Sequence, residues 1–248
     1  VSSGLSIKGF RVFASTFAAF LTRAHDQLRM ASLSSIPLTV CGSHSGVSIG
    51  DDGASQMGLD DIAMFRAFPS SAIFYPSDAV SCSQILASSL QKKGINYVRA
   101  TRAKTPVIYG GKENFPVGDF KILRESEKDK VVLVGAGITL HETLKAHSSL
   151  LKNKIETAIV DLYCIKPFNE KKFINFVKAH GGKIVIAEDH YAEGGIGEMI
   201  SEVIENENFK VKHLAVQEIP HSGKPEELLK KYEIDAEAIV KAARDLIK

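Results

Sequence analysis

Residues 41–56 read CGSHSGVSIGDDGASQ, and they decide how the rest of the chain is organised. This glycine-rich stretch follows an apolar run at 36–40, which predicts a short buried strand, and it precedes a helical pattern at about 57–67. In open α/β sheets, ligands bind at the carboxyl ends of the strands. His44 and two adjacent aspartates give the stretch donors, acceptors and an imidazole. A ligand-binding loop and an ordinary solvated surface loop both fit this composition.

Strand and helix patterns alternate along most of the chain. Strands are expected at 9–14, 36–40, 72–75, 96–100, 130–134, 157–161, 183–187 and 210–215. Helices are expected at about 15–30, 57–67, 78–93, 140–151, 170–179, 196–204, 224–231 and 235–247. This alternation predicts an α/β fold with mostly parallel sheets that helices cover on both faces, the doubly wound arrangement.

The alternation breaks between residues 105 and 130, where prolines and glycines stand among charged residues. One short strand is possible in this segment, at 119–124. Such breaks mark domain boundaries, because few contacts cross them. We therefore predict two doubly wound domains, 1–117 and 118–248.

The bulk composition excludes some classes of protein. The net charge is +2 and the basic residues are scattered, which argues against a nucleic-acid partner. No run of apolar residues is long enough to span a membrane, so we expect no membrane partner. Cys41, Cys82 and Cys164 are odd in number and lack metal-ligand spacing, which favours free thiols in a reducing compartment. The chain starts at Val1, which suggests a processed product or a fragment, and the apolar spacing at 15–30 favours a helix of the fold over a signal peptide.

Two strand ends in the second half carry weaker signals. Gly135 and Gly137, with Asp161 after the next strand, form two thirds of a dinucleotide fingerprint, but its third glycine is missing. A tight strand-to-helix turn is therefore favoured there. Residues 188–197 read EDHYAEGGIG, and they put carboxylates beside a histidine. That pattern suits a metal or acid–base chemistry, but a glycine-hinged turn into a helix explains it as well.

Two pairs of side chains are candidates for ligand contacts in the first half. Phe17 and Phe20 share a face of the first predicted helix, where they either pack in the core or form a stacking platform for a flat ring. Arg99 and Arg102 close the fourth strand, and a strand-end arginine can bind phosphate through its planar fork of donors. If the strands are neighbours, Arg102 lies near His44, and the two would form a site for an anionic, hydroxylated small molecule.

Five stretches together carry a family resemblance. They read FASTFAAF at 13–20, GSHSGVSIGDDGASQ at 42–56, FYPSD at 74–78, EDHYAEGGIG at 188–197 and HSGKPEELL at 221–229. In this order, and with Arg102, they make the chain resemble the C-terminal part of a transketolase of the animal type. The resemblance implies a thiamine-diphosphate-dependent transferase that moves a two-carbon ketol unit from a ketose phosphate to an aldose phosphate. It assigns 1–117 to a pyrimidine-binding domain and 118–248 to a C-terminal domain.

The resemblance also implies roles for single residues. Phe20 matches the ring that stacks on the aminopyrimidine of the cofactor, Phe17 lies beside it, and Gln56 matches a position near the cofactor. Many microbial and plant members have histidine at the position of Gln56. Three further residues match contacts to the sugar phosphate. They are His44 and Arg102, which hold the phosphate, and Asp52, which recognises a substrate hydroxyl.

Other parts of the family's site are expected outside this chain. The resemblance implies that the glutamate that activates the cofactor precedes Val1, and that the ligands of the diphosphate and of its Mg²⁺ or Ca²⁺ lie in an N-terminal diphosphate-binding portion. The family's site forms between two subunits, which implies a homodimer. The resemblance also implies a place in the pentose phosphate pathway and in the cytoplasm. We therefore expect no catalytic residue and no metal ligand in this chain, which would be inactive alone.

Two alternatives have the same broad features. One is the β-type subunit of a thiamine-dependent 2-oxo-acid dehydrogenase, which shares the two-domain plan but needs no clamp for a sugar phosphate. The other is a non-catalytic dimerisation fragment. Sugar-phosphate kinetics would separate the first alternative from a transketolase, and cofactor binding would separate the second.

Overall fold

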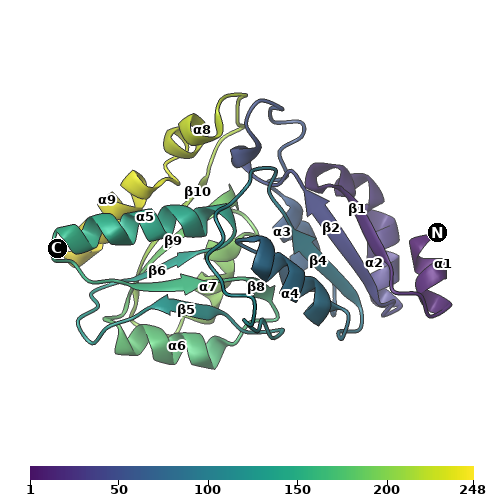
Figure 1. Cartoon of the computed structure of the whole chain (residues 1–248), viewed down its shortest axis with the longest axis horizontal. Helices are drawn as coiled ribbons and strands as arrows, with labels where there is room; N and C mark the ends of the chain where they lie inside the picture. Colours follow the sequence, from purple (N-terminus) through teal and green to yellow (C-terminus); the bar gives the residue numbers. More distant parts are fainter.

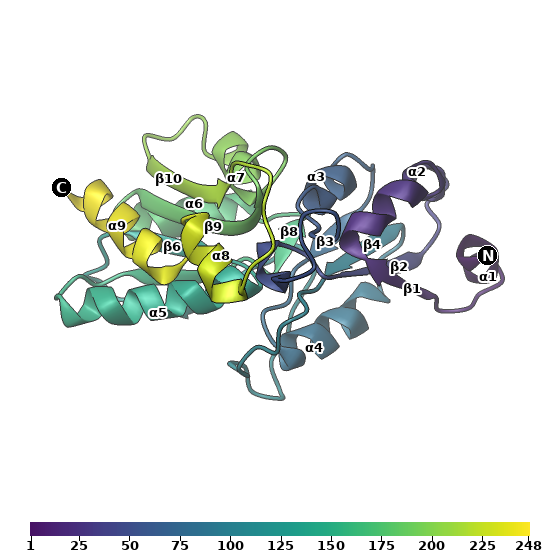
Figure 2. The same cartoon turned by 90° about the horizontal axis from the view of Figure 1, so that it is seen from above.

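The computed structural model describes residues 1–248 and contains two five-stranded sheets that lie side by side (Figure 1). The two ends of the chain lie at opposite ends of the molecule (Figures 1 and 2). None of the helices combines the length and the apolar character that crossing a membrane requires.

The first sheet is built mainly by the first half of the chain. Its strand order is β1 (Phe13–Phe17), β2 (Leu38–Ser43), β4 (Ile95–Arg99), β3 (Ala72–Phe74) and β8 (Cys164–Lys166). The first four strands are parallel, and β8 runs antiparallel to β3. Since β8 comes from the second half of the chain, the two halves share this sheet. The sequence did not predict β8, because three residues carry too little periodicity.

The second sheet belongs entirely to the second half. Its strand order is β10 (Lys210–Val216), β9 (Lys183–Tyr191), β6 (Val132–Gly135), β7 (Ala158–Asp161) and β5 (Lys121–Arg124). Four strands are parallel, and β5 is an antiparallel edge strand paired with β7. Successive residues of β6 point to opposite faces, because side chains alternate along a strand.

Helices cover both faces of the second sheet, as Figure 2 shows. On one face, the strands pack against α6 (Glu170–Ala179) and α7 (Ile196–Val203), and Val132 and Val134 point to this side. On the other face, they pack against α5 (Ile138–Lys152) and α9 (Ala236–Ile247). Leu133 points to that side. The doubly wound arrangement is therefore confirmed for this sheet.

The first sheet is also covered on both faces. One side packs against the 3₁₀ helix η1 (Ala18–Ala24), α2 (His25–Leu33) and α3 (Asp61–Arg66), and the other packs against α4 (Ala79–Ser89). Asp78 caps α4, and its carboxylate accepts from the backbone N–H of Ser81 (2.7 Å). The apolar side of α2 and α3 joins that of α6 and α7 in one continuous core.

The N-terminal elements differ from their prediction. The strand expected at 9–14 runs from Phe13 to Phe17 instead, and a short helix α1 (Ser2–Ile7) precedes it. The helix expected at 15–30 is replaced by the end of β1, η1 and α2. The reason is the parallel ladder from Phe13 opposite Thr39 to Phe17 opposite Ser43, which satisfies the backbone groups that a helix would otherwise use. Helical spacing of the phenylalanines could not reveal this pairing.

Candidate functional site

The candidate site lies where β2 and β4 end side by side. The backbone N–H of Ala100 donates to the carbonyl of Gly42 (2.8 Å), and the N–H of Ser45 donates to the carbonyl of Ala100 (3.2 Å). The chain after β4 is thereby fixed to the glycine-rich loop after β2. The sequence predicts Arg102 near His44 only if their two strands are neighbours. This condition is met, because β2 pairs with β4.

Two backbone hydrogen bonds of Gly58 close the loop after β2 at its neck, the place where the start and the end of the loop meet. The N–H of Gly58 donates to the carbonyl of His44 (3.2 Å), and the N–H of Gly46 donates to the carbonyl of Gly58 (2.8 Å). Gly46 has φ 82° and Gly50 has φ 84°, a region that glycine adopts readily, while His44 enters it with φ 57°. The loop contains the 3₁₀ turn η2 (Val47–Ile49), and α3 begins at Asp61, later than the sequence predicted.

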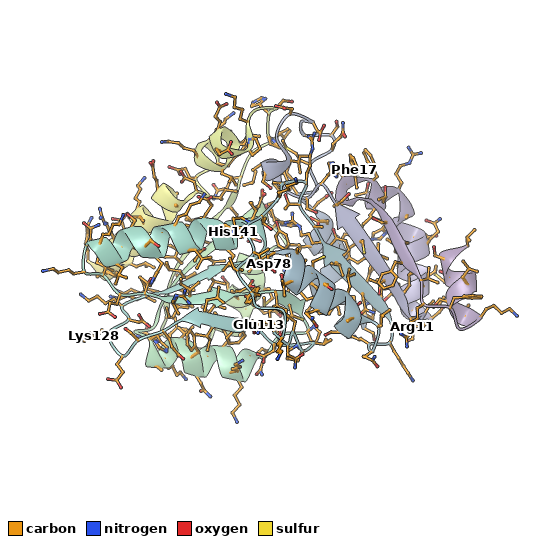
Figure 3. All side chains as sticks on the ribbon, viewed as in Figure 1. Arg11, Phe17, Asp78, Glu113, Lys128 and His141 are labelled. Carbon is orange, nitrogen blue, oxygen red and sulfur yellow. The ribbon has the colours of Figure 1, made fainter.

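Three aromatic rings form a row at the start of the site. The rings of Phe17 and His44 stack with their centroids 3.7 Å apart, and those of Phe17 and Phe20 stack at 5.2 Å. Phe17 ends β1 and Phe20 lies on η1, so the prediction that both share one helix face is wrong. Phe20 is nonetheless 44% exposed, so part of its ring is open to solvent. Figure 3 labels Phe17 at the upper end of the first sheet.

A polar pair joins the same loop to the segment after β4. Arg102 Nη1 donates to a carboxylate oxygen of Asp52 (2.9 Å) and lies 3.4 Å from the carbonyl oxygen of Ile49. Half of the Arg102 side chain is exposed, so its remaining donors can reach a ligand. Gln56 is half-buried, and its backbone N–H donates to the carbonyl of Gly53 (3.1 Å).

Arg99, three residues before Arg102, is fully buried and has a different partner set. Its Nε donates to Asp61 (2.8 Å), and its Nη2 donates to the carbonyls of Gly58 (2.9 Å) and Asp189 (2.8 Å). Burial by itself would raise the pKa of Asp61, but the charge of Arg99 together with that of His190 outweighs burial and lowers it. Arg99 therefore serves the structure, and of the two arginines only Arg102 is open to a ligand.

The tail motif at 221–229 also reaches the loop. A Cβ atom on Gly53 would lie 2.7 Å from Ser222 Oγ, and one on Gly50 would lie 3.0 Å from the carbonyl oxygen of Gly223. The helix α8 (Pro225–Lys231) follows and lies beside the loop in Figure 1. Spacing along the sequence gave no sign of this contact, because about 170 residues separate the two segments.

The carboxylates at the start of the motif at 188–197 make structural contacts. Glu188 accepts from the backbone N–H groups of Ile196 (2.6 Å) and Gly197 (2.9 Å) at the start of α7, and also from His213 Nε2. The interpretation as a glycine-hinged turn into a helix fits these contacts. Asp189, the second carboxylate of this motif, accepts from backbone groups of the glycine-rich loop.

The other strand-end motif of the second half is structural as well. Gly137 has φ 55°, and a Cβ atom there would lie 2.1 Å from the ring of Tyr75. That close approach fits the tight turn rather than a dinucleotide site. Asp161 is buried between the sheets, where it accepts from Ser77 Oγ (3.1 Å) and from the Tyr109 hydroxyl. Figure 3 shows His141 in the same region, and its Nε2 donates to the carbonyl of Ser77 (2.7 Å).

Comparison with known families assigns both halves. The family model described as "Transketolase, pyrimidine binding domain" matches residues 1–107, and the one described as "Transketolase, C-terminal domain" matches residues 118–239. The chain belongs to the transketolase family. The family resemblance of its sequence motifs is thus confirmed. The alternative of a 2-oxo-acid dehydrogenase subunit is not favoured.

Individual relatives agree with this family. The transketolase of Homo sapiens is 48% identical over 95% of this chain and 38% of its own length. A transketolase-like protein 2 of Mus musculus is 47% identical over 100% of this chain and 40% of its own length. The chain therefore spans about two fifths of the length of these curated relatives.

Solved structures of transketolases have the same fold. One described as a split gene transketolase in an inactive β4 tetramer is 28% identical, with a TM-score of 0.90, and the match covers 99% of this chain and 79% of that chain. The transketolase of Leishmania mexicana has a TM-score of 0.82 at 20% identity, over 99% of this chain and 36% of that chain. At 20% identity, the likeness to the Leishmania mexicana structure shows the fold alone.

One surface of this chain suits the kind of ring that the name of the matched pyrimidine-binding domain implies. The exposed part of the Phe20 ring offers an apolar surface for the pyrimidine ring that the name of the matched domain implies. No group of three or more His, Cys, Asp or Glu side chains gathers in this chain so as to hold a metal ion. The fit of the residues present therefore concerns the ring.

Proposed function

We propose that this chain supplies one wall of a transketolase site, which transfers a two-carbon ketol unit from a ketose phosphate to an aldose phosphate. Thiamine diphosphate, when bound, supplies the nucleophilic carbon for that transfer. The residues of this chain bind and orient the cofactor ring and the sugar phosphate. Its family membership and its 48% identity to a protein named transketolase support the proposal.

The observation that carries the proposal is the continuous row of the Phe20, Phe17 and His44 rings. It puts a flat apolar platform beside the loop that contains Asp52, the ion-pair partner of Arg102. A ring-shaped cofactor and an anionic, hydroxylated substrate need these two kinds of surface next to each other. In our proposal, the pyrimidine stacks on Phe20, and Gln56 lies near it.

The polar residues have separate tasks in the proposed site. The guanidinium of Arg102 and the imidazole of His44 donate hydrogen bonds to the phosphate of the sugar. Asp52 accepts a hydrogen bond from a substrate hydroxyl, and its ion pair with Arg102 keeps both side chains in place before the sugar arrives. The stacking of His44 on Phe17 holds the imidazole plane parallel to the platform.

The remaining parts of the proposed site come from partners. An N-terminal diphosphate-binding portion would hold the diphosphate and its Mg²⁺ or Ca²⁺, and a second copy of the chain would complete a homodimer. A related split gene transketolase has been described as a β4 tetramer, which supports assembly between such chains. We place the complete enzyme in the cytoplasm and in the pentose phosphate pathway, and the three free cysteines are in keeping with a reducing compartment.

The test is to supply the missing part. The chain is combined with the N-terminal portion of an animal transketolase, thiamine diphosphate and Mg²⁺, and ketol transfer from xylulose 5-phosphate to ribose 5-phosphate is assayed. We expect activity with both parts and none with either part alone. In the active assembly, Arg102→Ala and His44→Ala should each raise the KM for the sugar phosphates by about 10- to 100-fold, because a charge-assisted hydrogen bond is lost.

Arg124→Ala is the matched control, because Arg124 is an exposed arginine on the edge strand β5 of the other sheet. It should leave the KM at the wild-type value. Unchanged KM values for Arg102→Ala and His44→Ala would show that the loop does not bind the sugar phosphate. No transfer in any combination of the two parts would contradict the proposed activity.

The isolated chain provides a second check. Sedimentation should show a dimer, and titration should show very weak binding of thiamine diphosphate, because the proposed diphosphate contacts lie outside this chain. Tight binding by the isolated chain would mean that the cofactor uses a different site.

A further inference from the structure

The glycine-rich loop has a backbone shape that its own residues do not maintain. His44 has φ 57°, although the left-handed region is sterically unfavourable for a residue with a side chain. The 3₁₀ turn at Val47–Ile49 is only three residues long, and its first N–H groups have no acceptor within the turn. Contacts from outside the loop must therefore hold it.

One carboxylate of the C-terminal domain makes these contacts. Asp189 is fully buried near the end of β9, and its Oδ1 accepts from the N–H of Val47 (2.7 Å) while its Oδ2 accepts from the N–H of Ser48 (3.2 Å). A Cβ atom on Gly46 would lie 2.0 Å from Oδ2. The carboxylate thus occupies the space that a side chain at position 46 would need, and the absence of that side chain lets it reach the turn.

The backbone of Asp189 is itself held by Arg99. The Nη2 of Arg99 donates to the backbone carbonyl of Asp189 (2.8 Å) and to the carbonyl of Gly58 (2.9 Å). The carbonyl of Gly58 also accepts from Gly46 at the neck of the loop (2.8 Å). One buried guanidinium therefore fixes both the end of β9 and the neck of the loop, so that the distance between them is set.

We propose that the C-terminal domain shapes the sugar-phosphate loop through Asp189, which makes Asp189 a positioning residue for the side chains of that loop. The inference rests on the proposed function of the loop. The turn that Asp189 caps leads directly to Ile49, whose carbonyl oxygen lies 3.4 Å from Arg102 Nη1. Release of the turn would loosen Arg102 and its partner Asp52, and with them the site for the phosphate.

The first experiment measures amide hydrogen exchange by NMR in the 248-residue chain, with no ligand present. Asp189→Ala removes both acceptor oxygens. Gly46→Ala adds a Cβ atom in the space of the Asp189 carboxylate and so separates the carboxylate from the Val47 and Ser48 amides. Both variants should reduce the protection of the Val47 and Ser48 amides by about tenfold or more relative to the amides of β6, the effect of about one lost hydrogen bond to a charged acceptor.

Asp129→Asn is the matched control for a buried aspartate of the same domain. Asp129 accepts from the N–H of Ser126 (2.7 Å) and contacts His180, on segments that make no contact with the loop. This variant lowers the overall stability but should leave the protection of Val47 and Ser48 unchanged relative to β6. The comparison separates a local effect on the loop from a general loss of stability.

The second experiment measures kinetics in the complete enzyme. Asp189→Ala should raise the KM for ribose 5-phosphate by about tenfold and change kcat by less than about threefold, because Asp189 bonds the turn at Val47 and Ser48 and the cofactor ring is proposed to stack on Phe20. Asp189→Asn keeps one acceptor oxygen and should give an intermediate KM. A purely structural role would lower the melting temperature and leave the KM as it is.

The possible results are distinct. Wild-type protection of Val47 and Ser48 in Asp189→Ala, or an unchanged KM in an active enzyme, would overturn the inference. If the wild-type assembly shows no ketol transfer, the proposed function fails, and the exchange experiment still decides whether Asp189 shapes the loop.

Discussion

Two strand ends meet at the junction of the two sheets, residues 43–56 after β2 and residues 188–197 at the end of β9. Both contain a histidine, two adjacent carboxylates and several glycines. In the second segment, backbone N–H groups occupy both carboxylates, Glu188 at the start of α7 and Asp189 at the loop turn. In the first, Asp52 pairs only with the half-exposed Arg102. The same residue types are thus structural where backbone donors saturate them, and they are free for a ligand where they do not.

The largest effect that this comparison predicts is at Arg99, which binds both strand ends. Arg99→Ala should lower the free energy of unfolding by about 3–5 kcal/mol, because it leaves the buried carboxylate of Asp61 without its countercharge. Urea denaturation measures the change. Arg102→Ala is the control and should cost less than about 1 kcal/mol, since its ion pair is half exposed. Equal losses of stability for the two variants would contradict the assignment of Arg99 to the structure and of Arg102 to the ligand.

The next effect concerns Asp161, a third strand-end carboxylate with structural contacts. Burial raises its pKa from 3.8 to about 7, so the folded state keeps a proton that the unfolded state releases near pH 4. This group therefore stabilises the fold fully at low pH, and its contribution of up to about 4 kcal/mol is lost as pH rises through about 7.

Asp161→Asn should remove that part of the pH dependence. The experiment compares the free energy of unfolding of the wild type and the variant from pH 4 to pH 8, and their difference should change with pH in this window. A difference that is constant with pH would contradict the raised pKa.

A moderate effect is expected at Glu188. Glu188→Gln keeps one acceptor oxygen for the two N–H groups at the start of α7, so the variant should lose about 1–3 kcal/mol of stability by urea denaturation. The KM for sugar phosphates in the complete enzyme should not change. A raised KM with normal stability would show that this segment also contacts the substrate.

The smallest effect is expected at Asp51, which is exposed next to Asp52 and has no hydrogen-bond or ion-pair partner. Asp51→Ala should change the stability by less than about 0.5 kcal/mol and leave the KM for ribose 5-phosphate unaltered. Thermal unfolding and the coupled assay test both values. A loss above about 1 kcal/mol would mean that the loop depends on more carboxylates than the structure shows.

Much of the architecture follows from local patterns. The alternation of apolar strands and amphipathic helices predicts two doubly wound sheets, since strands buried on both faces need helices on both sides. The cap at Asp78 is a local backbone effect that the neighbouring Ser81 determines. β1 begins several residues later in the structure than the strand that the sequence predicts, because its position depends on pairing with β2 and not on its own periodicity.

The residue types that follow each strand can be read from the sequence, and its motifs identify the family, since long stretches in a fixed order are specific. Which of these residues remain free for a ligand depends on the folded chain. Arg99 and Arg102 are equivalent in sequence, yet one lies among Asp61, Gly58 and Asp189 while the other faces solvent. Burial and hydrogen-bond saturation depend on segments far apart in the chain, here the first loop and β9. No local pattern in the sequence contains that information.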